Sequence, residues 1–520
     1  MAKKPSKKEN KPKSSFFVCE IPLKVFPQEE SVLLTRLEAG RQLYNACLGE
    51  AMRRLNLIRQ SRDYQKARSL NKADSQRLVL FKKARTDFEF SDYAIQAYAT
   101  RIRHSWIGEH IDSHTAQKLA TRAYNAAEKV LFKKAKKVRF KGRNQMDSLE
   151  GKSNAAGIRW GTDAMEWSGL KLSAIINDYD PLIIHGLASR VKYCRLVRRK
   201  RNGRNLFYAQ LVCVGIPFQK PNNRIGSGDV GLDIGPSTIA VVSEESASLR
   251  QFAAEVELLD LQLRKLQRKL ARSRRANNPE NYNSNGTFKK GRLNWNNSNN
   301  YIKTRDSKAN LERKLAGQRK SLHGKMVNEI LREGNVIKLE KLSYKAFQKL
   351  FGKSVGRRAP GMFVSHLKRK AENANAKVVE FPTYSTKLSQ TCHCGRVKKK
   401  KLERRVHQCE CGVLAQRDLY SAFLAKYIDP DNHVLQVNQA SDAWYSEESR
   451  LRAAWRTATQ NETASRGLLP SSFGRCPESE QFVAEVQTQT PKSQDVVAVK
   501  REPGKGCPPR KDRGVGTPQL

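Results

Sequence analysis

Apolar residues occupy every second position from Phe17 to Val25. A period of two predicts a half-buried β-strand, because successive side chains of a strand point to opposite faces. From about residue 29 the apolar spacing becomes that of a helix, with many arginines and lysines around the stripe. These patterns continue to about residue 137, so a basic helical unit follows the first strand.

Two further strand-like runs cover residues 191–197 and 206–214. The basic turn between them has Asn202 and Gly203 at its tip, and Asn-Gly between such runs is typical of a β-hairpin. The helical unit separates the first strand from this hairpin. A small β-barrel interrupted by a helical insertion accounts for both features, and we expect the basic tip to reach toward a phosphate backbone.

The second half of the chain alternates strands with helices. The pattern predicts a strand, a tight turn and a second strand over residues 228–243, and further strands at 335–340 and 377–381. Residues 465–520 lack periodicity, which predicts disorder. Helices are predicted at 252–275, 306–333, 344–351, 362–374 and 438–458, with an Asn-rich loop at 277–300 and a Gly/Pro/Arg loop at 352–361.

The charge of the chain limits its partners. The 520 residues carry a formal net charge of +48, from 98 Lys and Arg against 50 Asp and Glu. That length favours about three domains, and so large a charge calls for a polyanion or a membrane surface. Basic residues spread over the whole chain favour nucleic acid, and we find no transmembrane run or secretory signal, so no membrane partner is expected.

The ten cysteines divide into a scattered set and a clustered set. Without a secretory signal, they indicate free thiols in a reducing cytoplasm instead of a disulfide scaffold. Four of the scattered cysteines stand in apolar surroundings, and free cysteine is among the most buried residue types. Core positions are therefore expected for Cys19, Cys47, Cys194 and Cys213.

The clustered cysteines form two C-x-C-G pairs separated by a basic segment. Paired cysteines followed by glycine are typical of a tetrahedral Zn²⁺ ribbon, although the usual spacing is C-x₂-C. His393 and His407 are alternative ligands that rank after the cysteines, and four unligated thiols in a basic loop are the other interpretation. The predicted zinc ligands are Cys392, Cys394, Cys409 and Cys411.

Three carboxylates stand in apolar segments: Asp233 in GLDIG, Glu340 in VIKLEKL and Asp418 in QRDLYSAF. A carboxylate in such surroundings is costly unless its charge is compensated, and a divalent metal is one good compensator. Taken singly, the first can cap a turn, the second can pair with a lysine and the third can cap a helix. Together they favour a Mg²⁺ site of two ions for phosphodiester hydrolysis.

Two basic runs are candidate nucleic-acid contacts. One is the C-terminal half of the helix at 252–275, which few acids balance, and the other separates the cysteine pairs. For each run, the alternative is a charged face that is simply solvated. The residues are Lys265, Arg268, Lys269, Arg272, Arg274, Arg275, Lys398, Lys399, Lys400, Lys401, Arg404 and Arg405.

The order of motifs resembles the C-terminal half of TnpB proteins, the transposon-encoded RNA-guided DNA endonucleases. The motifs are GLDIG, VIKLEKLS, the cysteine segment and RDLYSAFLA. Compact type V CRISPR effectors are relatives of TnpB. The segments FFVCEIPLKVFP and RQLYNACL are similar to the TnpB opening, so the resemblance covers roughly residues 16–427 and is most specific toward their C-terminal end.

The resemblance implies a multidomain α+β fold around a split RuvC nuclease domain of the RNase H-like α/β type. The nuclease would comprise 225–390 and 413–430, with the three acids as its catalytic Mg²⁺ ligands. The zinc ribbon, 391–412, would bind target nucleic acid. The other implied parts are a disordered basic arm (1–15), a β-barrel wedge domain (16–27 and 151–224), a helical recognition lobe (28–150) and a largely disordered C-terminal tail (431–520).

The resemblance also implies partners. A guide RNA would come from the transposon end (an omega RNA) or from a CRISPR array, and the double-stranded DNA target would be read beside a short flanking motif. The location would be a bacterial cytoplasm, near the nucleoid, and the oligomeric state stays open. Two other functions remain: RNA-guided DNA binding without cleavage, and a guide-free, structure-selective RuvC-type nuclease.

The chain departs from the TnpB pattern in three places. Tyr420 stands two residues after the third acid, where these proteins commonly have Asn. The cysteine pairs are tighter than usual, and the C-terminal tail is long. The tail can reflect a guide RNA that overlaps the end of the reading frame, in which case truncation near residue 430 should leave cleavage intact when the RNA is supplied separately.

Overall fold

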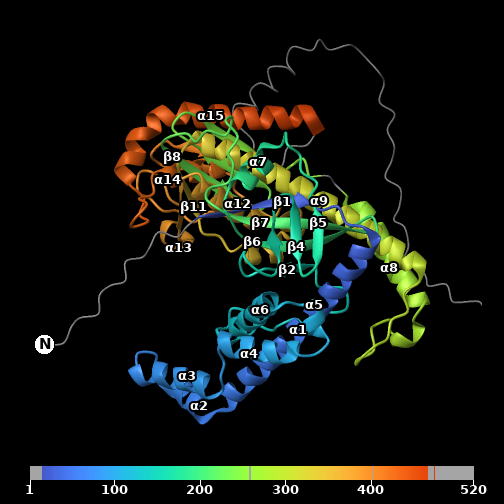
Figure 1. Cartoon of the computed structure of the whole chain (residues 1–520). Coiled ribbons are helices and arrows are strands. Elements are labelled where there is room, and N and C mark those ends of the chain that lie inside the picture. The colour runs from blue at the N-terminus through green and yellow to red at the C-terminus, as the bar shows by residue number, and fades with distance from the viewer. Residues whose placement is uncertain (1–14, 257–258, 402, 467–472, 475–520) are drawn as a thin grey trace, which may run out of the picture.

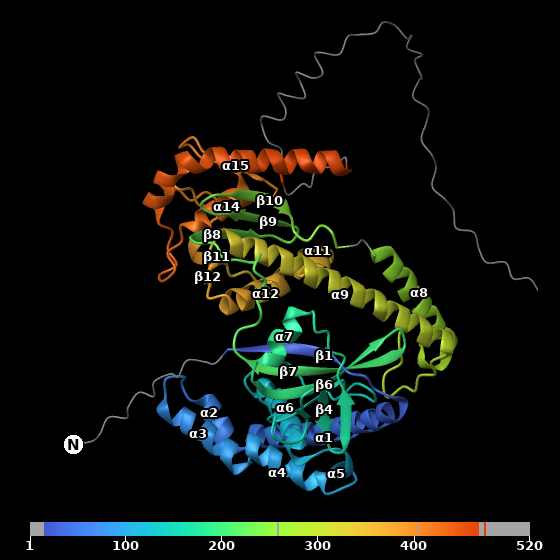
Figure 2. The same ribbon diagram turned by 45° about the horizontal axis from the view of Figure 1, so that its top comes forward.

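The computed structural model describes residues 15–256, 259–401, 403–466 and 473–474, with side chains of the last helix described up to Gln460. A helical layer packs on small antiparallel sheets, and a second unit is built on a five-stranded sheet (Figures 1 and 2). The predicted basic arm and nearly all of 465–520 lie outside the described residues.

The helical layer is organised by α1 (Pro27–Gln60), which packs against α4 and α6. Its apolar residues recur at helical spacing, so Leu33, Leu37 and Leu48 are buried on one face. At its start, the Glu29 carboxylate accepts a hydrogen bond from the Phe26 N–H at 2.8 Å. The other helices of the layer are α2 (Arg62–Ser69), α3 (Ser75–Asp87), α4 (Asp92–Arg103), α5 (Ile107–His110) and α6 (Ser113–Leu131).

The first strand does pair with the later hairpin. The antiparallel sheet has the order β1-β7-β6-β2, and Phe16 of β1 is opposite Val214 of β7. Its residues share one hydrophobic core with α1 and α6, because the inward positions of β1 and β7 face those helices. The elements are β1 (Phe16–Pro22), β2 (Ser148–Glu150), β6 (Val191–Arg201) and β7 (Arg204–Val214), with a second sheet of β3 (Arg159–Trp160), β4 (Ala164–Trp167) and β5 (Leu170–Ser173), and helix α7 (Pro181–Ala188).

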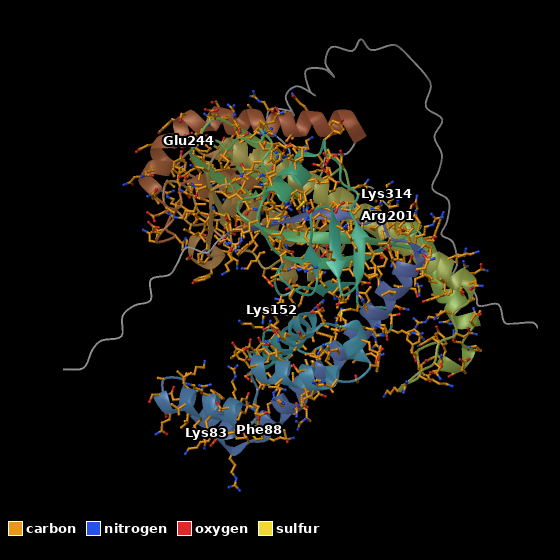
Figure 3. The ribbon with its side chains drawn as sticks, viewed as in Figure 1. Lys83, Phe88, Lys152, Arg201, Glu244 and Lys314 are labelled. Carbon is orange, nitrogen blue, oxygen red and sulfur yellow. The ribbon has the colours of Figure 1, made fainter. Side chains whose placement is uncertain are left out.

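The tip of the β6–β7 hairpin rests against the long helix α9 (Asn299–Glu333). The Asn202 N–H donates to Asn310 Oδ1 at 3.3 Å, and Lys200 lies 3.9 Å from Asp306. Figure 3 shows Arg201 of this turn in the same part of the molecule as Lys314 of α9. The basic tip therefore contacts another part of the chain, which the sequence pattern did not indicate.

The second unit contains a mixed sheet with the order β10-β9-β8-β11-β12. The pairs β10–β9 and β9–β8 are antiparallel, whereas β11 runs parallel to both β8 and β12. Parallel neighbours bring their carboxyl ends to one edge of the sheet. The strands are β8 (Asp229–Ile234), β9 (Thr238–Val242), β10 (Ala247–Gln251), β11 (Val336–Glu340) and β12 (Lys377–Phe381).

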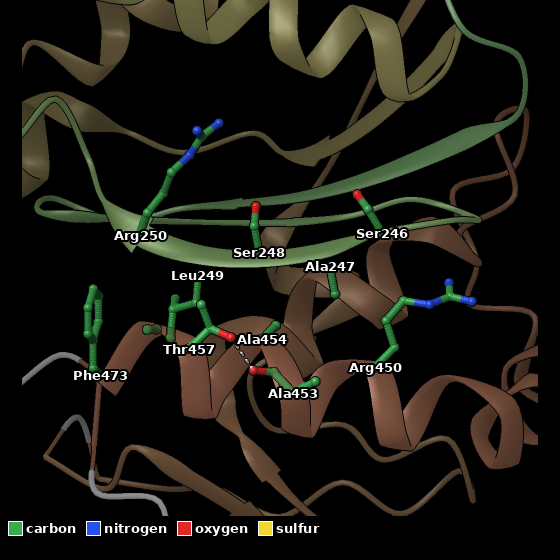
Figure 4. Close-up of a pocket in the computed structure, with 11 residues that line it drawn as sticks. Ser246, Ala247, Ser248, Leu249, Arg250, Arg450, Ala453, Ala454, Thr457 and Phe473 are labelled. Carbon is green, nitrogen blue, oxygen red and sulfur yellow. Dashed lines mark hydrogen bonds between the residues drawn. The ribbon is translucent and has the colours of Figure 1, made fainter. Parts of the chain in front are cut away.

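Helices cover both faces of this sheet, and each face has its own core. One core joins Leu232 and Ile337 to α9 and α12 (Pro360–Asn373). The other joins Ala240 and Val242 to α14 (Arg417–Lys426) and α15 (Val437–Arg466). A pocket of about 400 Å³ lies between β10 and α15, with Phe473 at one end (Figure 4).

The helices α8 (Asp260–Ala276) and α9 form an arm that extends away from the sheet (Figures 1 and 2). The Asn-rich segment at its tip is irregular, as predicted, but it is held by its own side chains. Asn278 bonds to the carbonyl oxygens of Arg274 and Asn296, both at 2.9 Å. The guanidinium of Arg274 lies 3.8 Å from the ring centre of Trp295. A short 3₁₀ turn, η1 (Pro279–Asn281), starts this segment.

Several predicted boundaries are wrong. Residues 352–361, expected as a loop, form α11 (Gly352–Arg358) and the start of α12, directly after α10 (Tyr344–Leu350). The helix expected from 252 begins at Asp260. The described part of the tail contains the helix predicted at 438–458, because α15 buries Trp444, Leu451 and Trp455 against α14 and the sheet. Of these helices, α12 and α15 are held by apolar contacts with distant segments, which local composition does not reveal.

The prediction for the scattered cysteines is confirmed. Cys19, Cys47, Cys194 and Cys213 are all buried with free thiols. Among the described residues, no helix is long and apolar enough to cross a membrane.

Candidate metal centres and nucleic-acid interface

Asp233 and Glu340 lie at the carboxyl ends of neighbouring parallel strands. Leu232 of β8 is paired with Leu339 of β11, so the residue after each comes at the same level of the sheet. Both acids are only partly exposed. Side chains of a strand point alternately to its two faces, and Leu232 and Ile234 belong to the α9 and α12 core, so Asp233 points to the face that α14 covers.

Asp418 reaches the same place from helix α14. The Thr238 hydroxyl lies 3.4 Å from Asp418 Oδ2, which joins this acid to the turn after Asp233. Asp418 is buried, and it is not the N-cap residue of its helix. That position belongs to Gln416, whose side-chain oxygen accepts from the Leu419 N–H at 2.7 Å. The helix-cap interpretation of Asp418 is therefore wrong.

The three acids repel one another electrostatically. Burial raises the pKa of Asp233 well above its ordinary value, and the charges of Asp418 and Glu340 raise it further. Burial also raises the pKa of Glu340 to about 7, although its carboxylate accepts a hydrogen bond from the backbone of Leu388. A cluster of this kind is stabilised by a divalent cation, which compensates the buried negative charge.

The spacing of the acids is looser than that of a closed metal cage. In the described ranges, the one group of three or more Cys, His, Asp or Glu with ligand atoms within 4.8 Å of one another is formed by cysteines. The acids do not form such a group. They fit an open site, in which water or substrate oxygens supply the remaining ligands of Mg²⁺.

Two arginines lie beside the acids. Arg417 Nε is 3.4 Å from Asp418 Oδ1, and its backbone N–H donates to the Arg405 carbonyl at 2.8 Å. Burial lowers the pKa of the Arg405 guanidinium, while the charges of Asp418 and Asp233 oppose that effect. Arg405, predicted as a contact on an exposed loop, is thus half-buried near the acids. Arg417 was missed, although it directly precedes the third acid in the sequence.

Tyr344 places a hydroxyl near the same acids. Burial raises the pKa of Tyr344, and the charges of Asp233, Glu380 and Glu340 add to the shift. Its Oη is buried and has no hydrogen-bond partner among the described residues. No sequence pattern had singled out this tyrosine, since an aromatic residue at the start of a helix usually belongs to the core.

The four clustered cysteines come together. Cys392 Sγ lies 3.5 Å from Cys411 Sγ, and Cys394 Sγ lies 3.6 Å from Cys409 Sγ. All four sulfur atoms are within 4.8 Å of one another, a spacing that can hold a metal ion. The short strands β13 (Val406–Gln408) and β14 (Leu414–Gln416) precede and follow the second pair.

Each pair ends in a glycine-containing turn. Gly395 and Gly412 have φ of 82° and 95°, a conformation that glycine adopts without strain. Burial opposes ionisation of Cys409, yet the Cys411 N–H and the neighbouring thiols lower its pKa to about 7. A thiolate at this position fits a soft or borderline cation such as Zn²⁺. The tighter C-x-C spacing does not prevent the four sulfurs from converging.

The two histidines of this region face a tyrosine instead of the sulfurs. His393 Nδ1 lies 2.9 Å from Tyr420 Oη, and the ring centres of His407 and Tyr420 are 4.1 Å apart. Burial is also the main reason that the pKa of His407 falls to about 3. The cysteines are therefore the better ligand set, as ranked from the sequence.

The comparisons with known proteins locate one domain within this region. Residues 361–424, from α12 into α14, match the model of the Cas12f1-like TNB domain family. This chain is related to the TnpB-like compact type V effectors. The Cas12f1-like match contains all four clustered cysteines and Asp418. The relationship suggested by the motifs is thus confirmed, and the α+β architecture of mixed sheets and helices agrees with it.

Two solved structures are similar to the chain at low levels. The first, a Cas12f1–sgRNA–target DNA complex, shares 13% identity with a TM-score of 0.43, covering 76% of this chain and 82% of that chain. The second, a CRISPR–Cas12f ternary complex, shares 13% identity with a TM-score of 0.25, covering 78% and 83%. Such TM-scores carry no weight for function. No curated protein matches this sequence.

Some of the predicted nucleic-acid contacts already bind other side chains of the protein, and others are exposed. Arg274 stacks on Trp295, Arg275 lies 5.2 Å from the ring centre of Tyr282, and Lys400 contacts His407. Burial lowers the pKa of Lys400 to about 8. The exposed residues are Lys265, Arg268, Lys269, Arg272, Lys398, Lys399, Lys401 and Arg404.

A basic groove that the sequence did not indicate lies between α6 and the sheet of β2, β6 and β7. Its volume is about 850 Å³. Tyr44, Asn125 and Thr121 line it together with the positive residues, and Asp147 and Glu150 are its acids. The helix and the hairpin are far apart in the sequence, so only their packing creates the groove. Its cationic residues are Lys118, Arg122, Lys129, Lys137, Arg139 and Arg195.

Proposed function

We propose that this protein is an RNA-guided DNA endonuclease that hydrolyses phosphodiester bonds at a RuvC-type site. The observation that carries the proposal is the convergence of Asp233, Glu340 and Asp418 from three distant segments, beside a Cas12f1-like TNB domain match at 361–424. The mixed sheet of antiparallel and parallel strands supports an RNase H-like nuclease. The cysteine cluster supports a zinc ribbon within the TNB region.

The acids would hold Mg²⁺, most simply as two ions around Asp233. When bound, Mg²⁺ lowers the pKa of a coordinated water and neutralises charge on the leaving oxygen. The charges of both other acids act on Asp233, so the three carboxylates together would hold the Mg²⁺. Arg417 and Arg405 place positive charge beside the carboxylates, where a phosphate oxygen of the scissile strand would come.

The remaining basic surfaces would hold nucleic acid. The groove between α6 and β6 and the exposed face of α8 carry more positive than negative charge. A guide RNA and its paired DNA strand would account for +48 better than one duplex, because they present more phosphate. The Cas12f1 complex similar to this chain contains an sgRNA and target DNA by its name, and we propose partners of the same two kinds.

Copurified RNA is the first test. We expect protein purified from its native locus to carry a discrete RNA with a variable segment, and to cut matching double-stranded DNA in Mg²⁺. Asp233→Asn should lower the cleavage rate by on the order of 10³-fold or more, because several kcal/mol of metal stabilisation are lost, while DNA binding survives. The matched control is Asp178→Asn, at an exposed acid.

The outcomes separate the candidate functions. Guide-dependent binding without cleavage by the wild type would favour an RNA-guided binding protein. Cleavage without RNA would favour a structure-selective nuclease. An equal cleavage rate for wild type and Asp233→Asn would contradict the proposed site.

A further inference from the structure

We propose that Tyr420 is a positioning residue that ties the cysteine metal site to the helix that carries Asp418. This inference rests on the proposed function only where it gives Asp418 a part in cleavage. The tie itself is a property of the cysteine site and of α14, and it can be measured without nuclease activity. Its basis is a buried hydroxyl that touches a metal-ligand residue from another element.

The hydroxyl of Tyr420 is surrounded by the first cysteine pair. Its Oη lies 3.3 Å from Cys392 Sγ, accepts a hydrogen bond from the His393 N–H at 2.9 Å, and lies 2.9 Å from His393 Nδ1. Tyr420 is fully buried, and Cys392 is nearly so. Tyr420 belongs to α14, whereas the cysteine follows α13 (Thr383–Thr386), so the contact joins two separate segments.

The hydroxyl has one proton and two neighbours that can accept it. The N–H of His393 already uses one lone pair of the oxygen, so the proton goes either to Cys392 Sγ or to His393 Nδ1. A cysteine that ligates a metal is a thiolate, and charge-assisted hydrogen bonds are the stronger ones. With a metal present, the proton therefore points to Cys392, where it supports the ligand from outside.

The ring of Tyr420 cannot move away without moving its helix. It is packed against the ring of His407 at 4.1 Å, and against Trp444 and Phe423 at 5.3 and 5.8 Å between centres. These neighbours come from β13, α15 and α14. A densely packed cluster of this kind transmits displacement instead of absorbing it. A shift of the cysteine pair is therefore transmitted to α14, whose first turn carries Asp418.

The residue at this position departs from the pattern that the chain otherwise resembles. The TnpB pattern commonly has Asn two residues after the third acid, and here Tyr420 occupies that position. A tyrosine that served only to fill the core would need no polar contacts at its tip. Its hydroxyl instead makes the three contacts that bind it to Cys392 and His393.

The test compares metal retention in full-length variants. Tyr420→Phe keeps the ring and removes only the hydroxyl, so we expect Zn²⁺ affinity to fall about 10- to 100-fold in a chelator competition. The Co²⁺-loaded variant should also show a shifted thiolate-to-metal charge-transfer band. The matched control is Tyr445→Phe on α15, whose side chain is 87% exposed. Wild-type affinity and an unchanged cobalt spectrum in Tyr420→Phe would overturn the proposal.

A measurement on the wild-type protein covers the case in which the variant does not fold. Removing the metal with a chelator should speed amide hydrogen exchange in α14 by about 10-fold or more, with α12 on the opposite face of the sheet unchanged. An equal amide exchange rate in α14 with and without metal would contradict the proposed connection between the cysteine site and α14. Neither metal affinity nor amide exchange depends on DNA, so both measurements remain valid even if the protein proves not to be a nuclease.

Discussion

A methyl group on Gly231 of β8 would lie 1.9 Å from the carbonyl oxygen of Ala422 in α14. The helix crosses the strand at this glycine with no room for a side chain. Because Asp233 is two residues along the strand and Asp418 is one turn back along the helix, the close approach brings the two acids to the same place. Backbone contact, and not the acids themselves, positions the site.

Substituting this glycine should separate the acids. We expect Gly231→Ala to displace α14, to lower the free energy of unfolding by about 1–3 kcal/mol through overpacking, and to reduce cleavage more than DNA binding. Urea unfolding and a cleavage assay measure the two effects. The control is Gly317→Ala in α9, where no atom lies within 4 Å of the added methyl, so stability should stay the same or rise. Wild-type stability in Gly231→Ala would contradict the packing described.

The raised pKa of Glu340 makes stability depend on pH. Its folded pKa of about 7 exceeds the ordinary 4.5, so the folded state binds more protons and metal-free protein should lose stability as pH rises from about 4.5 to 7. The loss from this group is at most about 3 kcal/mol. Denaturant unfolding of wild type and Glu340→Gln should diverge over that range, with the variant flatter.

Magnesium supplies the control for this pH effect. Added Mg²⁺ should offset the loss at pH 7 in wild type and have less effect in Glu340→Gln, because the ion compensates the ionised carboxylates. Parallel stability curves for the two proteins between pH 4.5 and 7 would show that Glu340 ionises normally.

The position of a C-terminal truncation should decide whether the nuclease sheet stays folded. Ending the chain at residue 430 removes α15 and leaves Lys426 without Glu447, a buried pair 3.0 Å apart. We therefore expect this truncation to abolish cleavage even with RNA supplied separately, contrary to the hypothesis of a dispensable tail. A chain that ends after Gly474 keeps every described contact and should retain activity.

A point substitution isolates the buried pair from the rest of α15. Glu447→Gln should cost about 3–5 kcal/mol, because it leaves the buried Lys426 charge uncompensated. Glu448→Gln, one residue on, breaks a surface pair with Arg452 and should cost less than about 1 kcal/mol. Thermal or denaturant unfolding compares the two variants, and equal costs would contradict a structural role for the buried pair.

The basic groove should contribute to nucleic-acid affinity without sequence preference. Lys129→Ala and Arg139→Ala each remove an exposed charge from its lining, so binding should weaken and the slope of log K against log salt should fall by about 1 per residue. Lys72→Ala, an exposed lysine of the same layer outside the groove, is the control. Salt slopes equal to the wild type in both groove variants would exclude phosphate contact there.

Much of the local structure followed from the sequence. The strand at the start of the chain, the Asn202-Gly203 hairpin and four strands of the five-stranded sheet lie close to their predicted positions, whereas β10 was not predicted. Each has a strong local signal, either a period of two or a turn dipeptide. The acids and cysteines were also visible as motifs, because unusual residue types in apolar or paired patterns are recognisable one segment at a time.

The failures occurred where packing overrides local composition. Residues 352–361 contain glycine, proline and arginines, yet α11 and the start of α12 form there, and α12 buries Pro360 and Phe363. The helix that became α15 was predicted at 438–458, but the burial of its tryptophans against α14 depends on packing that the sequence pattern does not show.

The sequence by itself determined which chemical groups this protein carries: three acids, four clustered cysteines and a large positive charge. Tertiary structure decided which of them meet. The Gly231 contact brings Asp418 to Asp233, Tyr420 reaches Cys392 from another helix, and α6 and β6 together form the basic groove. Periodicity reports the burial of a single element, whereas a site depends on the distance between elements, which is set by the side chains that fit between them.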